Sequence, residues 1–368
     1  MKYYVNFGQK NNMYMHQIAA GFTMLMAEKK YDVIFSEKAS LVDEFYHSAI
    51  IEVCVKNKRI IYDLSDGYNN YPSFSALDRM LDNVDVYFKA TIKRSFHNGF
   101  RNASKIKEIP PRYNVTCRNS WVNTVDIKEI FGKNGKTELR RIYDRLPCSK
   151  HWIGLYYDKA YEMEPMINDD PMVFFYTRLW DPAIASSKSS QNVDLDGGDV
   201  QSRIEQKKEE YSEITKLRAG LVRALKNEFG IRFLGGVAAD NFSQKYCPDL
   251  LGSDMSSRKK YTELLHKADI CINTQGTHKC WNFSFGEEIA ASKAIITEQP
   301  FYEVPAHMAV GTNFLTYTSI DECIQQATLL YKNEEALFRM MNANRSYYLS
   351  YLRPDRYVEN SILEALGE

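Results

Sequence analysis

The residues best suited to chemistry lie in the segment 259–298, where a polar, glycine-containing loop joins an apolar run to a helical pattern. The apolar run 270–273 predicts a strand, and the following helix is expected to begin near Ser284. A helix N-terminus presents unpaired backbone N–H groups and a positive dipole end, which suit a pyrophosphate. Gly276 and Gly286 would let the backbone approach such a ligand closely.

Charged side chains of the same segment suit the rest of a nucleotide. A glutamate in the first helical turn, such as Glu287, can accept hydrogen bonds from ribose hydroxyls, and His278 and Lys279 can donate to phosphate or sugar oxygens. Each also has a structural interpretation. Glu287 could simply interact with the helix dipole, which is worth up to about 1 kcal/mol, and His278 could be a satisfied loop histidine.

This segment resembles the donor-binding region of GT-B glycosyltransferases, in particular bacterial surface-polysaccharide enzymes. Their pattern is G-x-H, then W, then G-E-x-x-A-A-S-K-A-I, and its places are occupied here by Gly276, His278, Trp281, Gly286, Glu287 and 290–295. The resemblance implies that Glu287, rather than Glu288, contacts the ribose.

The resemblance covers most of residues 172–366 and little of 1–160. The run FFYTRLWDP resembles the start of the family's C-terminal domain, where an arginine, here Arg178, often reaches the donor diphosphate. The helix and strand at 217–236 resemble the family's next helix and strand. Arg218 and the pair Gly235–Gly236 occupy the matching positions. The expected donor-binding residues are Arg178, Arg218, Thr274, Gly276, His278, Lys279, Ser284 and Glu287.

One position departs from the family's pattern. Many retaining relatives carry an E-x7-E motif, and the residue eight places before Glu287 is Lys279. The first glutamate, which usually grips the donor sugar, is therefore absent. Two alternatives to a transferase stay open: a nucleotide-sugar 2-epimerase, which shares the fold and a similar ribose-binding glutamate, and a non-catalytic homologue that binds a sugar or scaffolds an assembly.

The elements that position these residues alternate short apolar runs with helical patterns, which indicates an α/β protein with parallel sheets. Strands are expected at 3–7, 31–35, 49–55, 59–64, 85–88, 172–177, 231–234, 268–273 and 293–298. Helices are expected at 13–29, 74–81 and 202–229, and from 335 onward. The fold class is therefore α/β, and the resemblance specifies GT-B: two Rossmann-like domains facing a central cleft.

The acid- and proline-rich stretch EMEPMINDDP suits a solvated linker and divides the chain. We expect an acceptor-binding domain at 1–160, a linker at 161–171 and a nucleotide-sugar-binding domain at 172–346. Residues 347–368 resemble the family's last helix, which crosses back to the N-terminal domain.

The acceptor side offers fewer candidates. An inverting reaction needs a general base that faces the cleft, whereas a retaining one does not. Asp66 follows the predicted strand 59–64, with Gly67 relaxing the turn, and is our candidate for this base. An Asx turn or a helix cap is the competing interpretation. His16 and His97 are weaker candidates.

No metal or other cofactor is expected beyond the nucleoside diphosphate sugar itself. The sequence has no HExxH motif and no Cys/His cluster. Asp194 and Asp196 form a formal DxD, but they lie in a Ser- and Asp-rich stretch that reads as a solvated loop. Basic side chains and a helix N-terminus are expected to stabilise the leaving diphosphate instead.

Bulk composition indicates a cytoplasmic protein without a nucleic-acid partner. The formal net charge is zero, the seven cysteines form no CxxC pair, and no apolar run is long enough to span a membrane. Residues 89–150, however, carry 15 Lys/Arg against 5 Asp/Glu. This excess favours peripheral contact with an acidic membrane or a phosphorylated acceptor, with a solvated basic face as the alternative. The expected partners are a nucleotide sugar and a saccharide acceptor, either free or linked to a lipid.

Overall fold

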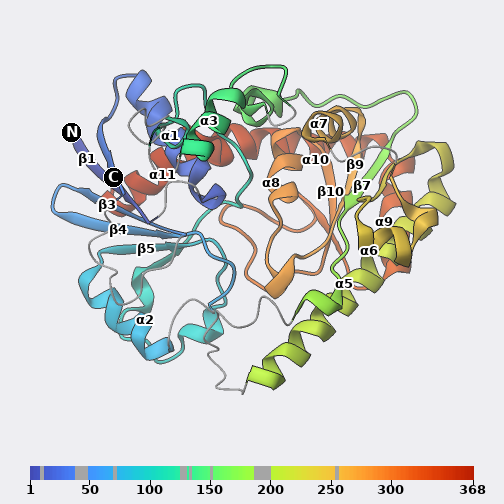
Figure 1. Cartoon of the computed structure of the whole chain (residues 1–368), viewed down its shortest axis with the longest axis horizontal. Helices are drawn as coiled ribbons and strands as arrows, with labels where there is room; N and C mark the ends of the chain where they lie inside the picture. Colours follow the sequence, from blue (N-terminus) through green and yellow to red (C-terminus); the bar gives the residue numbers. More distant parts are fainter. Residues whose placement is uncertain are drawn as a thin grey trace.

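The computed structural model describes residues 1–8, 12–37, 49–68, 73–124, 131, 135–149, 152–185, 200–252 and 257–368. The chain forms two α/β domains, which lie on the left and on the right of Figure 1. Asp194 and Asp196 fall outside the described residues.

The C-terminal domain is built on a five-stranded parallel sheet with the order β11-β10-β9-β7-β8. Its strands are β7 (Val173–Thr177), β8 (Phe233–Val237), β9 (Ile270–Asn273), β10 (Ala294–Glu298) and β11 (Leu315–Tyr317). The strand order reverses between β7 and β9. Ligands of such sheets bind beyond the carboxyl ends of the strands at this point.

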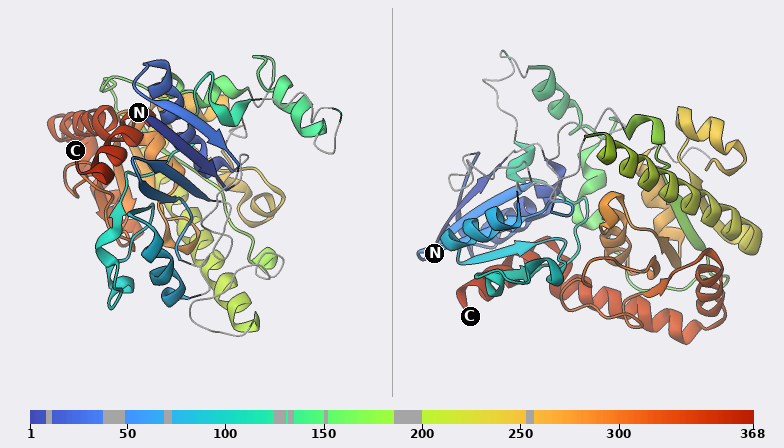
Figure 2. Two further views of the ribbon diagram at one scale, coloured as in Figure 1. Left: turned by 90° about the vertical axis from the view of Figure 1, so that its left-hand side faces the viewer. Right: turned by 90° about the horizontal axis from the view of Figure 1, so that it is seen from below.

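Helices cover both faces of this sheet (Figure 2). They are α5 (Val200–Phe229), α6 (Asn241–Tyr246), α7 (Arg258–Lys267), α8 (Phe283–Ala290), α9 (Ile320–Lys332) and α10 (Glu334–Tyr347). Leu221, Val222 and Leu225 of α5 recur at helical spacing and enter the core. Gly235 has φ 141°, and a Cβ there would lie 2.0 Å from the Phe175 carbonyl oxygen, so β8 needs a glycine at this position.

The N-terminal domain contains a six-stranded mixed sheet with the order β2-β1-β3-β4-β5-β6. Its strands are β1 (Lys2–Phe7), β2 (Asp32–Ser36), β3 (Ile50–Val55), β4 (Lys58–Asp63), β5 (Val86–Lys89) and β6 (Ile106–Glu108). The helices of this domain are α1 (His16–Ala27), α2 (Phe74–Met80) and α3 (Gly135–Tyr143).

The expectation of parallel strands is wrong for β3, which is antiparallel to both β1 and β4. Only Lys56 and Asn57 separate β3 from β4, and both have positive φ angles, 45° and 59°. Two such residues make a tight hairpin turn, whereas a parallel connection needs a crossover of a dozen or more residues.

The end of the chain returns to the N-terminal domain. A five-residue π-helical turn, Tyr348–Leu352, links α10 to α11 (Pro354–Leu366). Side chains of α11, including Val358 and Ile362, are part of the N-terminal core. Both chain termini therefore lie on the same domain (Figure 1).

Two buried clusters join the domains. One packs Tyr113 against Phe285 of α8, and the other packs Tyr68 against Tyr302. A cleft lies between the domains. The predicted α/β class and the GT-B arrangement of two Rossmann-like domains facing a cleft are therefore confirmed. Within the described segments, no helix has both the length and the apolar character needed to cross a bilayer.

Gly286 lies at a close contact between the domains. A Cβ there would sit 2.7 Å from the Arg112 carbonyl oxygen and 2.8 Å from Cβ of Tyr113. Gly286 is not among the residues that line the cleft. Its small size permits domain packing, so the expected close approach to a ligand is wrong for this glycine.

We expect Gly286→Ala to lower the free energy of unfolding by about 1–3 kcal/mol, because backbone atoms must shift to admit the methyl group. Gly220→Ala in α5 is the matched control, since its Cβ would meet only the flexible Cδ1 of Ile320, at 2.6 Å. Urea denaturation of both variants measures the effect. Equal stability of the two would refute a tight contact at Gly286.

Candidate functional site

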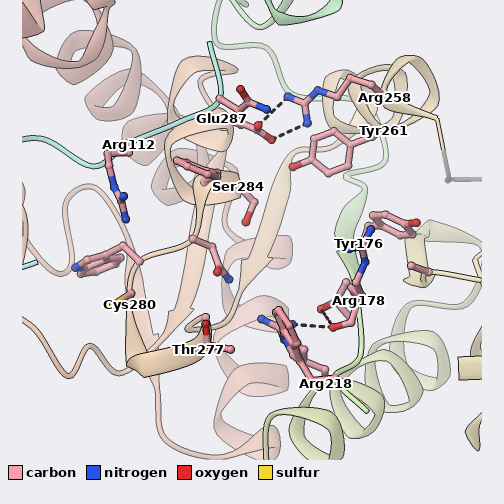
Figure 3. Close-up of a pocket in the computed structure, with 18 of the residues that line it drawn as sticks. Arg112, Tyr176, Arg178, Arg218, Arg258, Tyr261, Thr277, Cys280, Ser284 and Glu287 are labelled. Atoms are coloured by element: carbon pink, nitrogen blue, oxygen red, sulfur yellow. Dashed lines mark hydrogen bonds and ion pairs between the residues drawn. The ribbon is translucent and has the colours of Figure 1, made fainter. Parts of the chain in front are cut away.

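A cleft of about 820 Å³ opens between the domains, at the carboxyl ends of the C-terminal strands (Figure 3). The N-terminal domain contributes side chains to one wall: Tyr14, Asp66, Arg112, Asn114 and Tyr156. The C-terminal domain contributes the ends of β7 and β8, the loop after β9, and the first residues of α7 and α8. The location matches the switch point of the C-terminal sheet.

Arg218 of α5 lies at the floor of the cleft with only 6% of its surface exposed. Its Nε donates to Thr274 Oγ1 at 3.0 Å, Nη1 to the Arg178 carbonyl at 2.7 Å, and Nη2 to the Gln275 carbonyl at 3.1 Å. All three acceptors are neutral, and no described carboxylate forms an ion pair with this guanidinium. Burial lowers the pKa of Arg218 to about 10, because desolvation penalises the charge.

Further positive potential lies beside Arg218. Arg178 follows β7 directly, is exposed and lines the cleft. Helix α8 begins at the same wall, where Gly276 and Ser284 also line the cleft. The side chain of the N-cap residue Asn282 does not cap α8, and its amide donates instead to the Thr274 carbonyl. Two arginines and a helix N-terminus together make a site for an anion of high charge.

Glu287 lines the opposite end of the cleft and is held by Arg258 (Figure 3). Nη2 of Arg258 donates to Oε1 at 2.8 Å, and Nη1 donates to Oε2 at 3.1 Å. The guanidinium carbon lies 5.2, 4.9 and 4.8 Å from the ring centroids of Tyr156, Tyr161 and Tyr261. Burial opposes the Arg258 charge, but Glu287 more than offsets it and raises the pKa of Arg258. The two parallel hydrogen bonds thus fix the carboxylate of Glu287 in one orientation.

The neighbouring Glu288 faces away from the cleft. The Asn273 side-chain amide donates to both of its oxygens, at 3.2 and 3.1 Å. Complete burial raises the pKa of Glu288 well above its ordinary value. Of the two glutamates, Glu287 is the one that lines the cleft.

Three predicted donor-binding residues are not in the cleft lining. Thr274 is buried beneath it and accepts the hydrogen bond from Arg218. His278 and Lys279 have left-handed backbone conformations, with φ 60° and 55°. The backbone N–H of His278 donates to Glu210, and the Lys279 amine lies 5.3 Å from the Phe301 ring centroid. The structure therefore does not bring His278 and Lys279 together with the other donor-site candidates.

Asp66 lies on the N-terminal wall of the cleft, and each of its carboxylate oxygens has a partner. Oδ1 pairs with Nη2 of Arg112 at 2.6 Å, and Oδ2 accepts from the Tyr14 hydroxyl at 2.9 Å. The Arg112 guanidinium carbon lies 4.7 and 5.4 Å from the Tyr14 and Phe283 ring centroids. Asp66 lines the cleft and keeps one further acceptor site on each oxygen.

The two weaker base candidates lie outside the cleft lining. Burial, with a smaller effect of Arg141, lowers the pKa of His16 to about 4. Burial also lowers the pKa of His97 to about 4, and its Nε2 lies 2.9 Å from the Tyr68 hydroxyl. Both imidazoles are neutral at pH 7. Within the described residues, no three His, Cys, Asp or Glu side chains are grouped as a metal site would require.

Sequence reasoning missed Arg258 and Arg112. Arg258 occurs in SSRKKY, which resembles an ordinary helix start, and Arg112 follows two prolines. Their partners lie 29 and 46 residues away, so only the tertiary structure reveals the pairing.

No protein-family model and no curated protein matches this chain. Among solved structures, Anabaena Alr3699/HepE in complex with UDP has a TM-score of 0.45 and 10% identity, covering 99% of this chain and 98% of that one. The same protein in complex with UDP-glucose has a TM-score of 0.44 and 11% identity, covering 100% and 99%. The C-terminal domain of LpcC, a glycosyl transferase group 1 family protein from Francisella tularensis, has a TM-score of 0.32 and 10% identity, covering 52% and 95%.

Proposed function

We propose that this chain is a glycosyltransferase that binds a nucleoside diphosphate sugar in the cleft and transfers the sugar to a saccharide acceptor. The observation that carries the proposal is Arg218, a buried guanidinium whose three acceptors are all neutral. A diphosphate placed between Arg218, Arg178 and the start of α8 would supply the missing negative charge. The same groups would stabilise the charge that develops on the leaving diphosphate, without requiring a metal ion.

Glu287 would bind the ribose of this donor. A carboxylate offers about four acceptor sites, and Arg258 uses two of those on Glu287, so two are left for ribose hydroxyls. The three tyrosines around Arg258 would keep the carboxylate in one orientation. The base would then lie beside Ala238–Asp240, the stretch after β8 that also lines the cleft.

The acceptor would bind against the N-terminal wall. In an inverting reaction Asp66 would accept the proton of the attacking hydroxyl at one of the acceptor sites that Arg112 and Tyr14 leave on its oxygens. In a retaining reaction no such base is needed, and Asp66 would instead orient the acceptor. The acceptor class we favour is a saccharide, free or carried on a lipid, in surface polysaccharide or glycoconjugate synthesis. The reaction would then take place in the cytoplasm, at or near the inner face of the membrane.

A sugar-binding protein without transferase activity is the second candidate. It is favoured by Lys279, which replaces the first glutamate of the E-x7-E motif. A 2-epimerase would use the same donor site but no acceptor. Incubating the protein with a labelled nucleotide sugar, with and without an acceptor, distinguishes these outcomes. A transferase forms product only with the acceptor, an epimerase forms product without it, and a pure binding protein forms no product in either case.

The donor site is tested by comparing ribonucleoside diphosphates with their 2′-deoxy forms in isothermal calorimetry. We expect the wild-type protein to prefer the ribose form by about tenfold to a hundredfold, since a hydrogen bond to a charged group contributes about 1.5–3 kcal/mol. Glu287→Gln should lose most of this preference, because it removes the charge and the Arg258 pairing.

Glu288→Gln is the matched control, because the raised pKa of Glu288 means that the neutral amide resembles the native side chain. It should retain both the affinity and the ribose preference. Loss of the preference in Glu288→Gln but not in Glu287→Gln would contradict the ribose assignment. No binding of any nucleoside diphosphate would contradict the transferase proposal altogether.

A further inference from the structure

Helix α3 exposes apolar side chains and buries an acidic side chain. Three apolar side chains on one face of α3 are each between 42% and 55% exposed: Leu139, Ile142 and Tyr143. Leu146, in the turn that follows the helix, is 49% exposed. Glu138, in contrast, is buried and pairs with Arg141 at 2.6 Å. A surface helix of a globular protein ordinarily directs its apolar face to the core, so this orientation needs an explanation.

Basic side chains flank this apolar stripe. At 100° per residue, Lys136 and Arg140 lie directly beside it, and both are exposed. Phe131 precedes the helix and is 92% exposed. The patch thus combines five exposed apolar side chains with positive charge along its edge. We call it the α3 patch.

Helix α3 stands away from the body of the N-terminal domain in both views of Figure 2. The helix is anchored through its C-terminal end, where Arg145 donates to the Asn123 carbonyl at 2.6 Å and Ile153 N–H donates to the Asp144 carbonyl at 2.8 Å. These contacts fix the helix without covering its stripe.

Several other positive charges in the basic region 89–150 are paired. Arg101 pairs with Asp82 at 3.0 Å, and Arg112 pairs with Asp66 at 2.6 Å. Arg94 pairs with Glu108, and Arg140 of α3 lies 3.5 Å from Asp144. The local charge excess is therefore partly neutralised by acids, some from outside the region, whereas Lys136 of α3 is exposed and forms no ion pair with the described residues.

We propose that the α3 patch docks the protein onto an anionic lipid surface. An apolar stripe flanked by Lys and Arg matches a helix that lies in the bilayer interface, with its cations at the headgroups. A stable protein interface uses about 20–30 residues a side, far more than this patch presents. Because the patch lies outside the cleft, the proposal does not depend on the nucleotide site, although membrane docking would suit a lipid-linked acceptor.

The test is cosedimentation with vesicles of phosphatidylcholine alone and with about one-third phosphatidylglycerol. The wild-type chain should bind the anionic vesicles and not the neutral ones. Ile142→Asp should lower the partition by about tenfold or more, since it removes one buried aliphatic side chain and adds repulsion. The double variant Lys136→Glu/Arg140→Glu should lower the partition onto anionic vesicles by at least about fivefold for each charge changed.

Leu329→Asp is the matched control, because Leu329 of α9 is 63% exposed and lies in the other domain. It should leave the partition unchanged, and unaltered thermal unfolding would show that each variant folds. Absence of binding to anionic vesicles overturns the proposal, as does equal binding by Ile142→Asp. A dimer in size-exclusion chromatography that Ile142→Asp dissociates, without vesicle binding, would assign the patch to a second copy of the chain instead.

Discussion

Replacing Arg218 by Met should weaken the binding of nucleoside diphosphates by about 2–5 kcal/mol, a loss of thirtyfold or more. The guanidinium is buried and meets only neutral acceptors, so a bound diphosphate would be its sole close anionic partner within the described structure. Calorimetric titration with the diphosphate and with its sugar conjugate measures the loss.

The stability of the unliganded protein should respond quite differently to Arg218→Met. Methionine removes a buried charge that has no directly paired carboxylate among the described residues, and whose desolvation already lowers the pKa of Arg218 to about 10. It also removes three hydrogen bonds to neutral acceptors, each worth about 1 kcal/mol. These effects oppose each other, and buried ions replaced by apolar side chains often leave stability unchanged. We therefore expect a large loss of affinity with little change in the urea midpoint.

Arg223→Met is the control for this experiment, because Arg223 lies on the same helix but is exposed, with a weak pairing to Asp249 at 3.6 Å. It should bind nucleotides as the wild type does. Inorganic pyrophosphate should bind to the wild type and to Arg223→Met, but weakly or not at all to Arg218→Met. Equal pyrophosphate affinity in all three proteins would place the diphosphate elsewhere.

Much of the fold is readable from short-range patterns. The apolar run 31–35 corresponds to β2 (Asp32–Ser36), and 268–273 contains β9 (Ile270–Asn273). The short strands β6 and β11 were missed, since three residues are too few to form a periodic pattern. The antiparallel position of β3 was also missed, because the hairpin depends on two positive φ angles at Lys56 and Asn57 rather than on a glycine.

The candidate site shows the same division between local and tertiary information. The sequence pointed to Arg178, Arg218 and Glu287, which all line the cleft, because three local segments resemble the donor-binding region of a known family. It could not show that His278 and Lys279 lie outside the cleft lining with left-handed backbone conformations, because the contacts of this loop, such as that of the His278 N–H with Glu210, join residues far apart in the sequence.

The second large effect is expected at Lys89, beneath the loop that carries Asp66. Its Nζ lies 2.8 Å from Oδ2 of Asp63, and both side chains are completely buried. Asp63 also accepts from the Tyr87 hydroxyl at 2.6 Å and from the Ser65 N–H at 2.9 Å. Lys89→Met would leave the carboxylate buried without its cation, which should lower the free energy of unfolding by about 3–5 kcal/mol.

A double-mutant cycle separates the ion pair from simple loss of packing. Asp63→Asn alone should destabilise strongly because it leaves the Lys89 ammonium buried without its counter-ion, whereas Asp63→Asn/Lys89→Met removes both charges and should recover most of the loss. Additive losses would instead mean that the pair contributes only packing. Urea denaturation at constant ionic strength measures all four proteins.

The same cycle also tests how the acceptor wall is held in place. Lys89 donates to Ser65 Oγ at 3.3 Å, and Thr91 accepts from the Gly67 N–H at 3.2 Å, so β5 and the residues after it hold the turn on both sides of Asp66. The double variant should therefore retain nucleotide affinity, whose residues lie on the other domain, but transfer sugar more slowly or with a higher KM for the acceptor. If instead it loses nucleotide affinity and keeps acceptor kinetics, the division of the cleft into a donor wall and an acceptor wall is wrong.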